Sequence, residues 1–575
     1  MAEFFGQLKV ILTRSDRKKL LGLAALAIVI SAVETVGVSA VMPFITIAGN
    51  FDHIHSRPEL AKLYDRLGFQ SEADFVVVAG LVLFAFYTVR AVINFSYLHL
   101  LARFSFGNYH RLTVRLFDTF LGMPYAQFGT RNRAHMSKSI INEAACIAQM
   151  MQALLILMSE TFVGLSIYAL LLWVDWRITL VLSGLIATLG LILGVLLRNR
   201  IRAEGVRRES TQHQFYEMLN RTFGNYKLIK LLGGSAGPAS DFTRASRAYA
   251  DVNVRNTTMQ HVPRLVFEWL GFGFVVLFVT YMVARSAGDI SSMLGMLSVF
   301  VLGLYRLLPS VNRIVAASNE LTFNARAMEV VAHDLQMPRE ELGATPVKPM
   351  GELSARGLTF GYGDLPVLSE VNLDLRRGDK IAFVGESGAG KTTLVDLLTG
   401  LLTPTAGTLS ADGIEIGPDN VRQWRARVGY VPQHVFLFDG TLGENVAFGR
   451  PWDEERLWRA LEQADLADFA RGRLGLSTPA GDGGEMLSGG QRQRVAIARA
   501  LYTDPDVIVL DEATSALDHG TEERIMEQLY RVSAGKTLLV IAHRLSTIDG
   551  CDTVYRVAAG RIERLDRGHP SEERT

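Results

Sequence analysis

The stretch IAFVGESGAGKTTL, residues 381–394, decides the fold of the C-terminal part of the chain. An apolar strand pattern runs into a glycine-rich loop, and an apolar helix pattern follows it. Glycines in such a loop let backbone N–H groups surround phosphate oxygens, and the helix N-terminus favours an anion. Lys391 would reach the β and γ phosphates, and the Thr392 hydroxyl would bind Mg²⁺. The phosphate-contacting residues predicted here are Gly385, Glu386, Ser387, Gly388, Ala389, Gly390, Lys391, Thr392 and Thr393.

A second stretch, VIVLDEATSALD at residues 507–518, has four apolar β-formers followed by two acids. The Asp511 carboxylate, at the end of a strand beside the phosphate loop, can hold Mg²⁺ through water. Glu512 can orient or deprotonate the attacking water. Two acids can follow a strand by accident, but these follow the phosphate loop by about 120 residues. The pair therefore predicts hydrolysis of the bound nucleotide.

A third stretch, LSGGQRQR at residues 487–494, predicts a second phosphate-facing nest at the start of a helix. Its contacting residues would be Ser488, Gly489, Gly490 and Gln491. The glycine-rich loop already gives the domain one phosphate site. Because a nucleotide needs only one such loop within a domain, the second nest implies that the nucleotide lies between two copies of the domain.

The composition divides the chain of 575 residues into an apolar part before about residue 310 and a soluble α/β part after about residue 350. The net charge of +1 argues against a nucleic acid as partner. The two cysteines, Cys146 and Cys551, lie in different halves and imply neither a disulfide framework nor a metal cluster. The first apolar run, 20–48, is too long for a cleavable signal and predicts a retained span.

Six stretches approach or exceed the roughly 20 apolar residues that a membrane span needs. They are 20–48, 75–98, 150–174, 177–197, 264–285 and 290–313. Basic residues gather before the first span, between the second and third, and between the fourth and fifth. By the positive-inside rule, both termini are expected in the cytoplasm. The two long cytoplasmic connections predict helices that continue past the membrane and turn back, with transverse segments near 123–129 and 212–220.

One outer connection, SRPELAKLYDRLGF at residues 56–69, predicts a short external helix at about 58–67. Its apolar residues share one face. The helix either covers the outer helix ends or lies in the lipid interface. The predicted domains are a transmembrane domain at 1–335, a linker at 336–350, a nucleotide-binding domain at 351–567 and a flexible tail at 568–575.

The three stretches together resemble the nucleotide-binding domain of an ATP-binding cassette (ABC) transporter. The resemblance implies ATP and Mg²⁺ as ligands, with Mg²⁺ held by Thr392, Gln433 and Asp511. It also implies that Tyr362 in FGYGDLPVL stacks on adenine and that Gln433 in YVPQHVFLF senses Mg²⁺. By the same resemblance, Asp518 would end the loop that joins the two ATP sites, and His543 in IAHRLS would act with Glu512 in hydrolysis.

Six spans before one cassette are half of an exporter, so the resemblance implies the type I ABC exporter fold. The fold class is then a six-span α-helical membrane domain followed by an α/β P-loop ATPase domain with a helical subdomain. A homodimer is the simplest assembly, and a heterodimer with a similar chain is the alternative. The intact Glu512 and LSGGQ stretch favour the homodimer.

Four arginines lie toward the cytoplasmic half of the predicted spans: Arg90, Arg264, Arg306 and Arg313. Charge within a membrane is costly and points to function. Arginine suits phosphate because its planar fork binds two oxygens, so a cationic belt implies an anionic cargo with a lipid part. The alternative is snorkelling at the interface, with a local Arg264–Glu268 pair.

The membrane half resembles the PglK-type flippases of lipid-linked oligosaccharides in VETVGVSAVMPFITIA (33–48), FSYLHLLARFSFGNYH (95–110) and FVLGLYRLLPSVNRI (300–314). The resemblance implies that an undecaprenyl-diphosphate-linked glycan is turned to the periplasmic leaflet of the bacterial inner membrane for protein glycosylation. It also implies an external helix against the lipid tail. The alternatives are an exporter of drugs, peptides or a lipid A-like lipid, and an ATP-gated channel, against which the intact Glu512 and His543 argue.

Overall fold

The computed structural model describes residues 2–49, 51, 54–55, 58–129, 133–174, 176–234, 236–285, 291–363, 365–512, 519–542 and 548–565. Side chains in 281–304 and that of Arg306 lie outside the description. The chain forms two compact units, the first from Met1–Gly122 with Arg131–Met337 and the second from Met123–Thr130 with Pro338–Thr575. Each unit has buried apolar clusters of its own.

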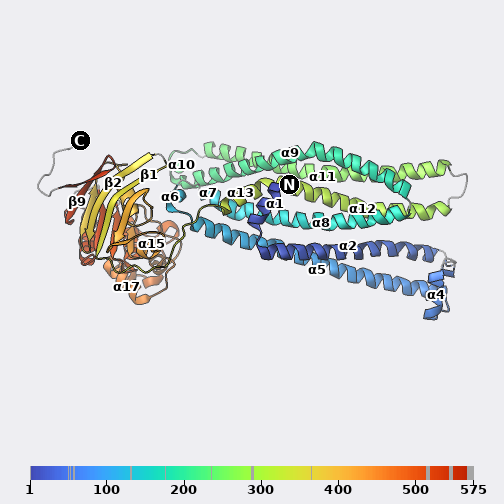
Figure 1. Cartoon of the computed structure of the whole chain (residues 1–575), viewed down its shortest axis with the longest axis horizontal. Coiled ribbons are helices and arrows are strands. Elements are labelled where there is room, and N and C mark those ends of the chain that lie inside the picture. Colours follow the sequence, from blue (N-terminus) through green and yellow to red (C-terminus); the bar gives the residue numbers. More distant parts are fainter. Residues whose placement is uncertain are drawn as a thin grey trace. The chain divides into compact units, whose positions relative to one another are not determined.

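The first unit is a bundle of helices (Figure 1). Six of the described helices are 31 to 50 residues long, and they contain the six expected spans to within one residue. They are α2 (Arg14–Gly49), α5 (Glu72–Leu121), α8 (Ala144–Val174), α9 (Trp176–Gly224), α11 (Ala236–Arg285) and α12 (Ser291–Phe323). The shorter helices are α1 (Ala2–Ile11), α4 (Pro58–Leu67), α7 (Arg133–Lys138), the π-helix η1 (Ser139–Glu143), α10 (Tyr226–Leu231) and α13 (Ala325–Leu335).

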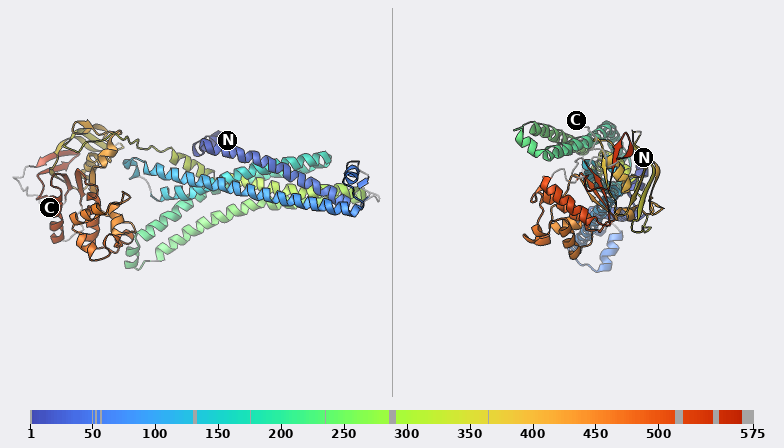
Figure 2. Two further views of the ribbon diagram at one scale, coloured as in Figure 1. Left: turned by 90° about the horizontal axis from the view of Figure 1, so that it is seen from below. Right: turned by 90° about the vertical axis from the view of Figure 1, so that its left-hand side faces the viewer.

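Helices α9 and α11 run side by side and extend well beyond their apolar parts, as the long connections predicted. In the left view of Figure 2 this pair diverges from α5 toward the end that carries α10. The predicted position of the turn between them was wrong. Residues 212–220 continue α9, and the chain turns at α10 and the glycines Gly233 and Gly234. The helical periodicity continues to Gly224, and glycine then supplies the positive φ that the turn needs.

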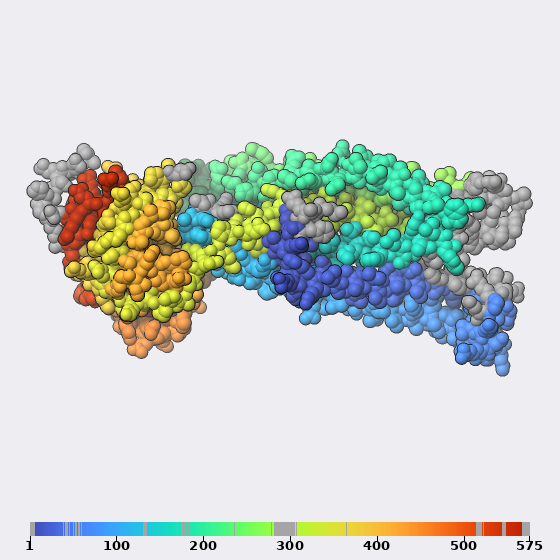
Figure 3. Space-filling model, in the orientation of Figure 1, coloured from blue at the N-terminus to red at the C-terminus, as the bar shows by residue number. Residues whose placement is uncertain are grey.

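Within the described residues, four segments are long and apolar enough to cross a membrane: Arg14–Gly37, Glu72–Leu121, His135–Trp173 and Thr179–Gly224. In the first unit, large apolar side chains such as Phe84, Val195 and Trp269 are exposed by 60% or more. Figure 3 shows α2 and α5 as adjoining dark and light blue strips on the surface of the bundle. Such exposure of long apolar helices is what a lipid-facing surface requires.

The external helix α4 matches the predicted 58–67. Tyr64 is 9% exposed and packs in a cluster with Ile47, Ile54 and Phe75. Leu63 and Leu67 on the same helix are 47% and 59% exposed and border an apolar pocket of about 390 Å³ between α2, α4 and α5. Part of the apolar face thus covers the outer helix ends, and part remains open. Ser56, predicted to cap the helix, lies outside the described residues.

A buried ionic cluster joins η1 to α9 in the same unit. The Glu143 side chain is 1% exposed and lies 3.2 Å from both Lys138 Nζ and Arg208 Nη2. Lys138 also pairs with Glu209 at 2.9 Å. Gly205 permits the close approach of α9 to α12, because an added Cβ would lie 2.2 Å from the Phe323 carbonyl oxygen. Charges and close packing therefore fix this end of α9 against its neighbours.

The second unit contains two sheets. A six-stranded sheet has the order β10-β9-β3-β8-β7-β6, in which β9, β3, β8, β7 and β6 are parallel and β10 is antiparallel to β9. An antiparallel sheet has the order β2-β1-β4-β5. The strands are β1 (Glu352–Tyr362), β2 (Leu365–Arg376), β3 (Lys380–Val384), β4 (Ala406–Ala411), β5 (Ile414–Glu415), β6 (Val428–Val431), β7 (Val507–Asp511), β8 (Thr537–Ile541), β9 (Thr553–Ala558) and β10 (Arg561–Leu565).

Helices accompany these sheets. Those outside the β6–β7 connection are α6 (Tyr125–Phe128), α14 (Lys391–Leu398), α15 (Val421–Arg425) and α20 (His519–Val532). The connection from β6 to β7 contains a group of helices: α16 (Leu442–Ala447), α17 (Glu454–Gln463), α18 (Ala467–Arg471), η2 (Gly475–Ser477), η3 (Asp482–Gly484) and α19 (Gly489–Leu501). The predicted first transverse segment, 123–129, contains α6 and belongs to this second unit, where Ala126 packs against its core.

Candidate ATP site and membrane cavity

The parallel sheet positions the phosphate loop. β3, β8 and β7 are adjacent, and their registers align Phe383 and Asp511 with Ile541. The carboxyl ends of these parallel strands therefore meet at one edge, where α/β folds bind ligands. The loop between β3 and α14 leaves the sheet at this edge, where Asp511 ends β7 and Glu512 follows it. His543 and Asp518, predicted to act here, lie outside the described residues.

At two positions of the loop, the backbone conformation and the close neighbours both require glycine. Gly385 has φ +148°, and a Cβ there would lie 2.3 Å from the Val557 carbonyl oxygen. Gly390 has φ +99° and caps α14 in the left-handed region, with Val367 and Leu368 side chains 3.2 Å from an added Cβ. Between them Glu386, Ser387 and Gly388 are exposed, so their backbone N–H groups are open to a ligand.

Lys391 lies within this loop and is 5% exposed. Its ammonium donates to the carbonyl oxygens of Gly385 and Glu386, both at 2.8 Å. Burial lowers the pKa of Lys391, and the Glu512 and Asp511 carboxylates oppose that shift. Thr392 and Thr393 follow at the start of α14, where Thr392 is exposed. A cation and a helix N-terminus at the same point suit a phosphate group.

The predicted Mg²⁺ ligands and the predicted base lie around the end of β7. Asp511 is 8% exposed and accepts a 2.7 Å hydrogen bond from the Tyr430 hydroxyl. Gln433 Nε2 donates to Glu512 Oε2 at 2.5 Å. The structure thus brings Gln433 and Glu512 together, and it holds Glu512 at φ +48°. A hydroxyl, an amide oxygen and a carboxylate are hard oxygen donors of the kind Mg²⁺ prefers.

Asp396 was not foreseen from the sequence. It lies on the buried face of α14 and is 5% exposed. Burial and the neighbouring Asp511 raise its pKa to about 7. Burial and Asp511 also raise the pKa of Tyr430. Asp396 therefore places a second carboxyl, partly protonated at neutral pH, beside the point where Mg²⁺ is expected.

Tyr362 ends β1 and is 44% exposed, with its ring edge-on to Phe360 at 5.0 Å. Such a ring is free to stack on a base. Ser488 caps α19 by accepting from Gln491 N–H at 3.2 Å, while Gln491 Oε1 accepts from Ser488 N–H at 2.8 Å. This capping box holds Gly489 and Gly490 in the first turn. The predicted second nest is therefore a rigid helix N-terminus.

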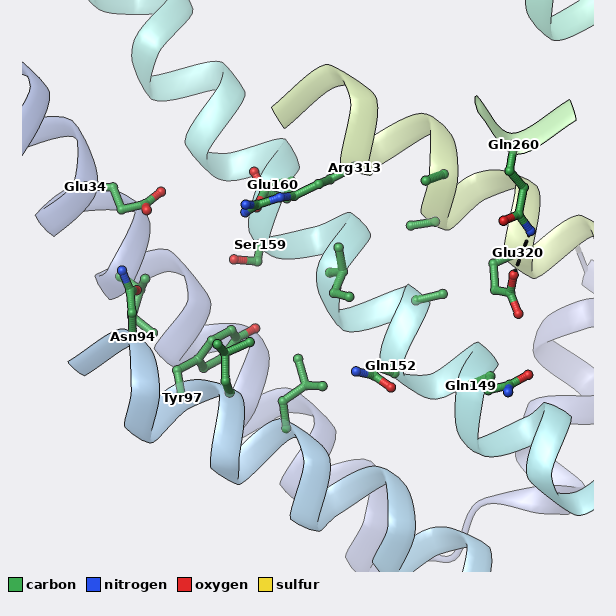
Figure 4. A pocket seen from close by; sticks show the side chains of 17 residues that line it. Glu34, Asn94, Tyr97, Gln149, Gln152, Ser159, Glu160, Gln260, Arg313 and Glu320 are labelled. Carbon is green, nitrogen blue, oxygen red and sulfur yellow. Dashed lines mark hydrogen bonds and ion pairs between the residues drawn. The ribbon is translucent and has the colours of Figure 1, made fainter. Parts of the chain in front are cut away.

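The first unit contains a cavity of about 730 Å³ between α2, α5, α8, α11 and α12 (Figure 4). Apolar side chains line much of it, and uncharged polar residues lie among them: Asn94, Tyr97, Gln149, Gln152, Ser159 and Gln260. Three carboxylates, Glu34, Glu160 and Glu320, also line it. Gln260 donates to Glu320 Oε2 at 3.0 Å. Such a lining suits a polar headgroup inside an apolar bundle.

The predicted arginines differ in position. Arg313 lines the cavity and pairs with Glu160 at 2.5 Å, and Figure 4 shows its side chain reaching from α12 to α8. Arg90 pairs with Glu34 at 2.9 Å. Arg264 makes the expected local pair with Glu268 at 2.8 Å and is 59% exposed. The Arg306 side chain lies outside the description, although its backbone lies in α12. Of the four predicted arginines, the three whose side chains the structure describes therefore each have a carboxylate partner.

Comparisons with known proteins agree with this architecture. Residues 368–515 match the family model described as ABC transporter. Two curated relatives are each described as an ATP-dependent lipid A-core flippase. The one from Burkholderia orbicola is 30% identical, covering 85% of this chain and 82% of its own. The one from Cupriavidus metallidurans is 32% identical, covering 82% and 81%.

A solved structure of a bacterial Atm1-family ABC exporter with ATP bound shares the fold. It is 24% identical, with a TM-score of 0.77 over 95% of this chain and 94% of that one. The exporter fold, a helical transmembrane domain joined to a nucleotide-binding domain, is thus confirmed. The chain belongs to the ABC transporter family, as an exporter half-transporter in the membrane that uses ATP with Mg²⁺ and couples its hydrolysis to transport.

Proposed function

We propose that the chain flips an undecaprenyl-diphosphate-linked oligosaccharide from the cytoplasmic to the periplasmic leaflet of the bacterial inner membrane, for protein glycosylation. The observation that carries the proposal is the cavity beside Arg313. Its amides and hydroxyls match the hydroxyl groups of sugars, and its arginine matches a phosphate. The resemblance of the membrane stretches to the PglK-type flippases supports the same cargo.

The ATP site supplies the driving force. In this proposal Tyr362 stacks on adenine, the phosphate loop and Lys391 hold the phosphates, and Thr392, Gln433 and Asp511 hold Mg²⁺. Bound Mg²⁺ would neutralise charge on the phosphates. Glu512 accepts a proton from the attacking water, with His543 beside the γ-phosphate. The Ser488–Gln491 nest of a second copy closes the site, and Asp518 joins the two sites, so the working form is a homodimer.

The segment that follows α5 transmits this closure in our proposal. Residues 123–129 belong to the ATPase unit and closely follow the end of α5 at Leu121 in the chain, so movement of that unit would pull on α5. Both termini lie in the cytoplasm in this proposal, and the domains end at 335, 350 and 567. The polyprenyl tail stays in lipid, with the open side of α4 beside it.

The relatives favour a second cargo. Their description as ATP-dependent lipid A-core flippases points to lipid A-core as the cargo. Stimulation of ATP hydrolysis separates the two cargoes. In nanodiscs, the diphosphate-linked oligosaccharide lipid should stimulate the chain at a lower concentration than lipid A-core does. Stimulation by lipid A-core alone, or by drugs and peptides alone, would reject the proposed cargo.

A further inference from the structure

Two arginine–glutamate pairs in the membrane unit differ in how firmly they are held. In the pair of Arg90 and Glu34 the side chains are 17% and 11% exposed. The Arg90 guanidinium also lies 5.3 Å from the centre of the Tyr87 ring. Arg90 is thus enclosed on several sides. Glu34 lines the cavity and Arg90 does not, so the carboxylate separates this arginine from the cavity.

The pair of Arg313 and Glu160 is open on one side. The Arg313 side chain is 58% exposed, whereas that of Glu160 is 9% exposed. Both residues line the cavity. Glu160 Oε2 is buried and has no hydrogen-bond partner among the described residues. A buried carboxylate oxygen without a donor is costly, and an exposed guanidinium keeps donors free for another anion.

We propose that Glu160 is the resident counter-ion of Arg313, and that a phosphate of the cargo displaces it. This inference rests on the proposed function, because it concerns the same cavity. Glu160 is then a specificity-determining residue. An uncharged headgroup cannot separate the pair, whereas a diphosphate replaces one carboxylate contact with a bidentate one. Departure of the cargo lets Glu160 return, which prevents an anionic headgroup from being trapped.

The test is binding of two probes to the full-length chain in phosphatidylcholine nanodiscs. The probes are fluorescent undecaprenyl diphosphate and fluorescent undecaprenol, which differ in headgroup charge. Glu160→Gln removes the competing charge at nearly constant volume, so it should bind the diphosphate about tenfold more tightly than the native chain, a difference of about 1.4 kcal/mol. Binding of undecaprenol should not change.

Two matched variants separate displacement from a structural role. Glu34→Gln removes a carboxylate from the same cavity but from the enclosed pair, and its gain in diphosphate binding should be well below that of Glu160→Gln. The double variant of Glu160→Gln with Arg313→Gln should lose the gain, because the gain depends on the freed arginine. Where Glu160→Gln unfolds at a much lower temperature than the native chain, Glu160→Asp replaces it. Its shorter side chain should give a smaller gain of the same sign.

The outcomes are distinct. If Glu160→Gln binds the diphosphate no more tightly than the native chain, the inference is overturned. The proposed cargo survives that result as long as the native chain binds the diphosphate more tightly than undecaprenol. Equal tightening for undecaprenol, or a gain that survives without Arg313, also overturns it. A native chain that binds both probes equally would overturn the proposed cargo and the inference with it.

Discussion

The side-chain amide of Gln433 donates to Glu512 Oε2 at 2.5 Å, and Glu512 itself lies at φ +48°. The two residues come from segments 79 positions apart and meet at the carboxyl edge of the sheet. A left-handed backbone is uncommon for a residue with a Cβ, so the surrounding structure holds the carboxylate in place. That arrangement fits a base aimed at one position.

Glu512→Gln should lower the rate of ATP hydrolysis by about 10²- to 10⁴-fold, because an amide cannot accept the proton of the attacking water. ATP binding should persist, since the phosphate loop is intact. Steady-state release of phosphate measures the rate of hydrolysis, and binding of a fluorescent ATP analogue measures whether ATP binding persists. Glu455→Gln, on the exposed face of α17, is the matched control and should hydrolyse ATP like the native chain.

Gly385→Ala should abolish ATP binding. Its Cβ would meet the Val557 carbonyl oxygen at 2.3 Å, and the residue would have to keep φ +148°. The loop must then shift, so its N–H groups no longer surround phosphate. Gly417→Ala is the control, because no atom lies within 4 Å of its added Cβ. ATP binding by Gly385→Ala at native affinity would show that the loop tolerates the shift.

Glu143→Gln should destabilise the first unit by about 3 kcal/mol, since it leaves Lys138 and Arg208 buried with less negative charge. Thermal unfolding of the full-length chain in detergent measures the effect. Glu329→Gln breaks an exposed pair with Arg326 and should change stability by less than about 1 kcal/mol. Equal effects of the two variants would mean that the buried cluster does not stabilise the fold.

Asp396 predicts a pH dependence of the nucleotide-free protein. Burial and the neighbouring Asp511 raise its pKa in the folded state to about 7 from the ordinary value of 3.8. Between these values the folded state binds more protons than the unfolded state, so stability falls as pH rises. Asp396→Asn removes this loss and should gain stability over the native chain from pH 4 to pH 8. Asp468→Asn, fully exposed, should show no such trend.

The cassette could be predicted from the sequence because its chemistry depends on local patterns. Residues 380–398 contain the strand, the loop and the helix in one continuous stretch. The external helix could also be predicted from a local signal, because proline begins it and glycine follows its end. Likewise, the lengths of the long helices followed from apolar runs and their helical continuation.

The counter-ions could not be predicted in the same way. Glu34 pairs with an arginine 56 positions away, and Glu160 with one 153 positions away, so only the packing of helices brings them together. The signal was present, because an acid within an apolar span is costly without a partner. The turn after α9 was misplaced for a related reason. The polar helix pattern extends past 212–220, and the break is marked by the later glycines.

The most direct test follows lipid movement in proteoliposomes that contain the purified chain and a fluorescent undecaprenyl-diphosphate-linked oligosaccharide. A quencher outside the vesicle reports which leaflet holds the probe. Movement should require ATP and should disappear in Glu512→Gln while persisting in Glu455→Gln. Hydrolysis of ATP by the native chain without any movement of this lipid would contradict the proposed function and leave the motor without the cargo assigned to it.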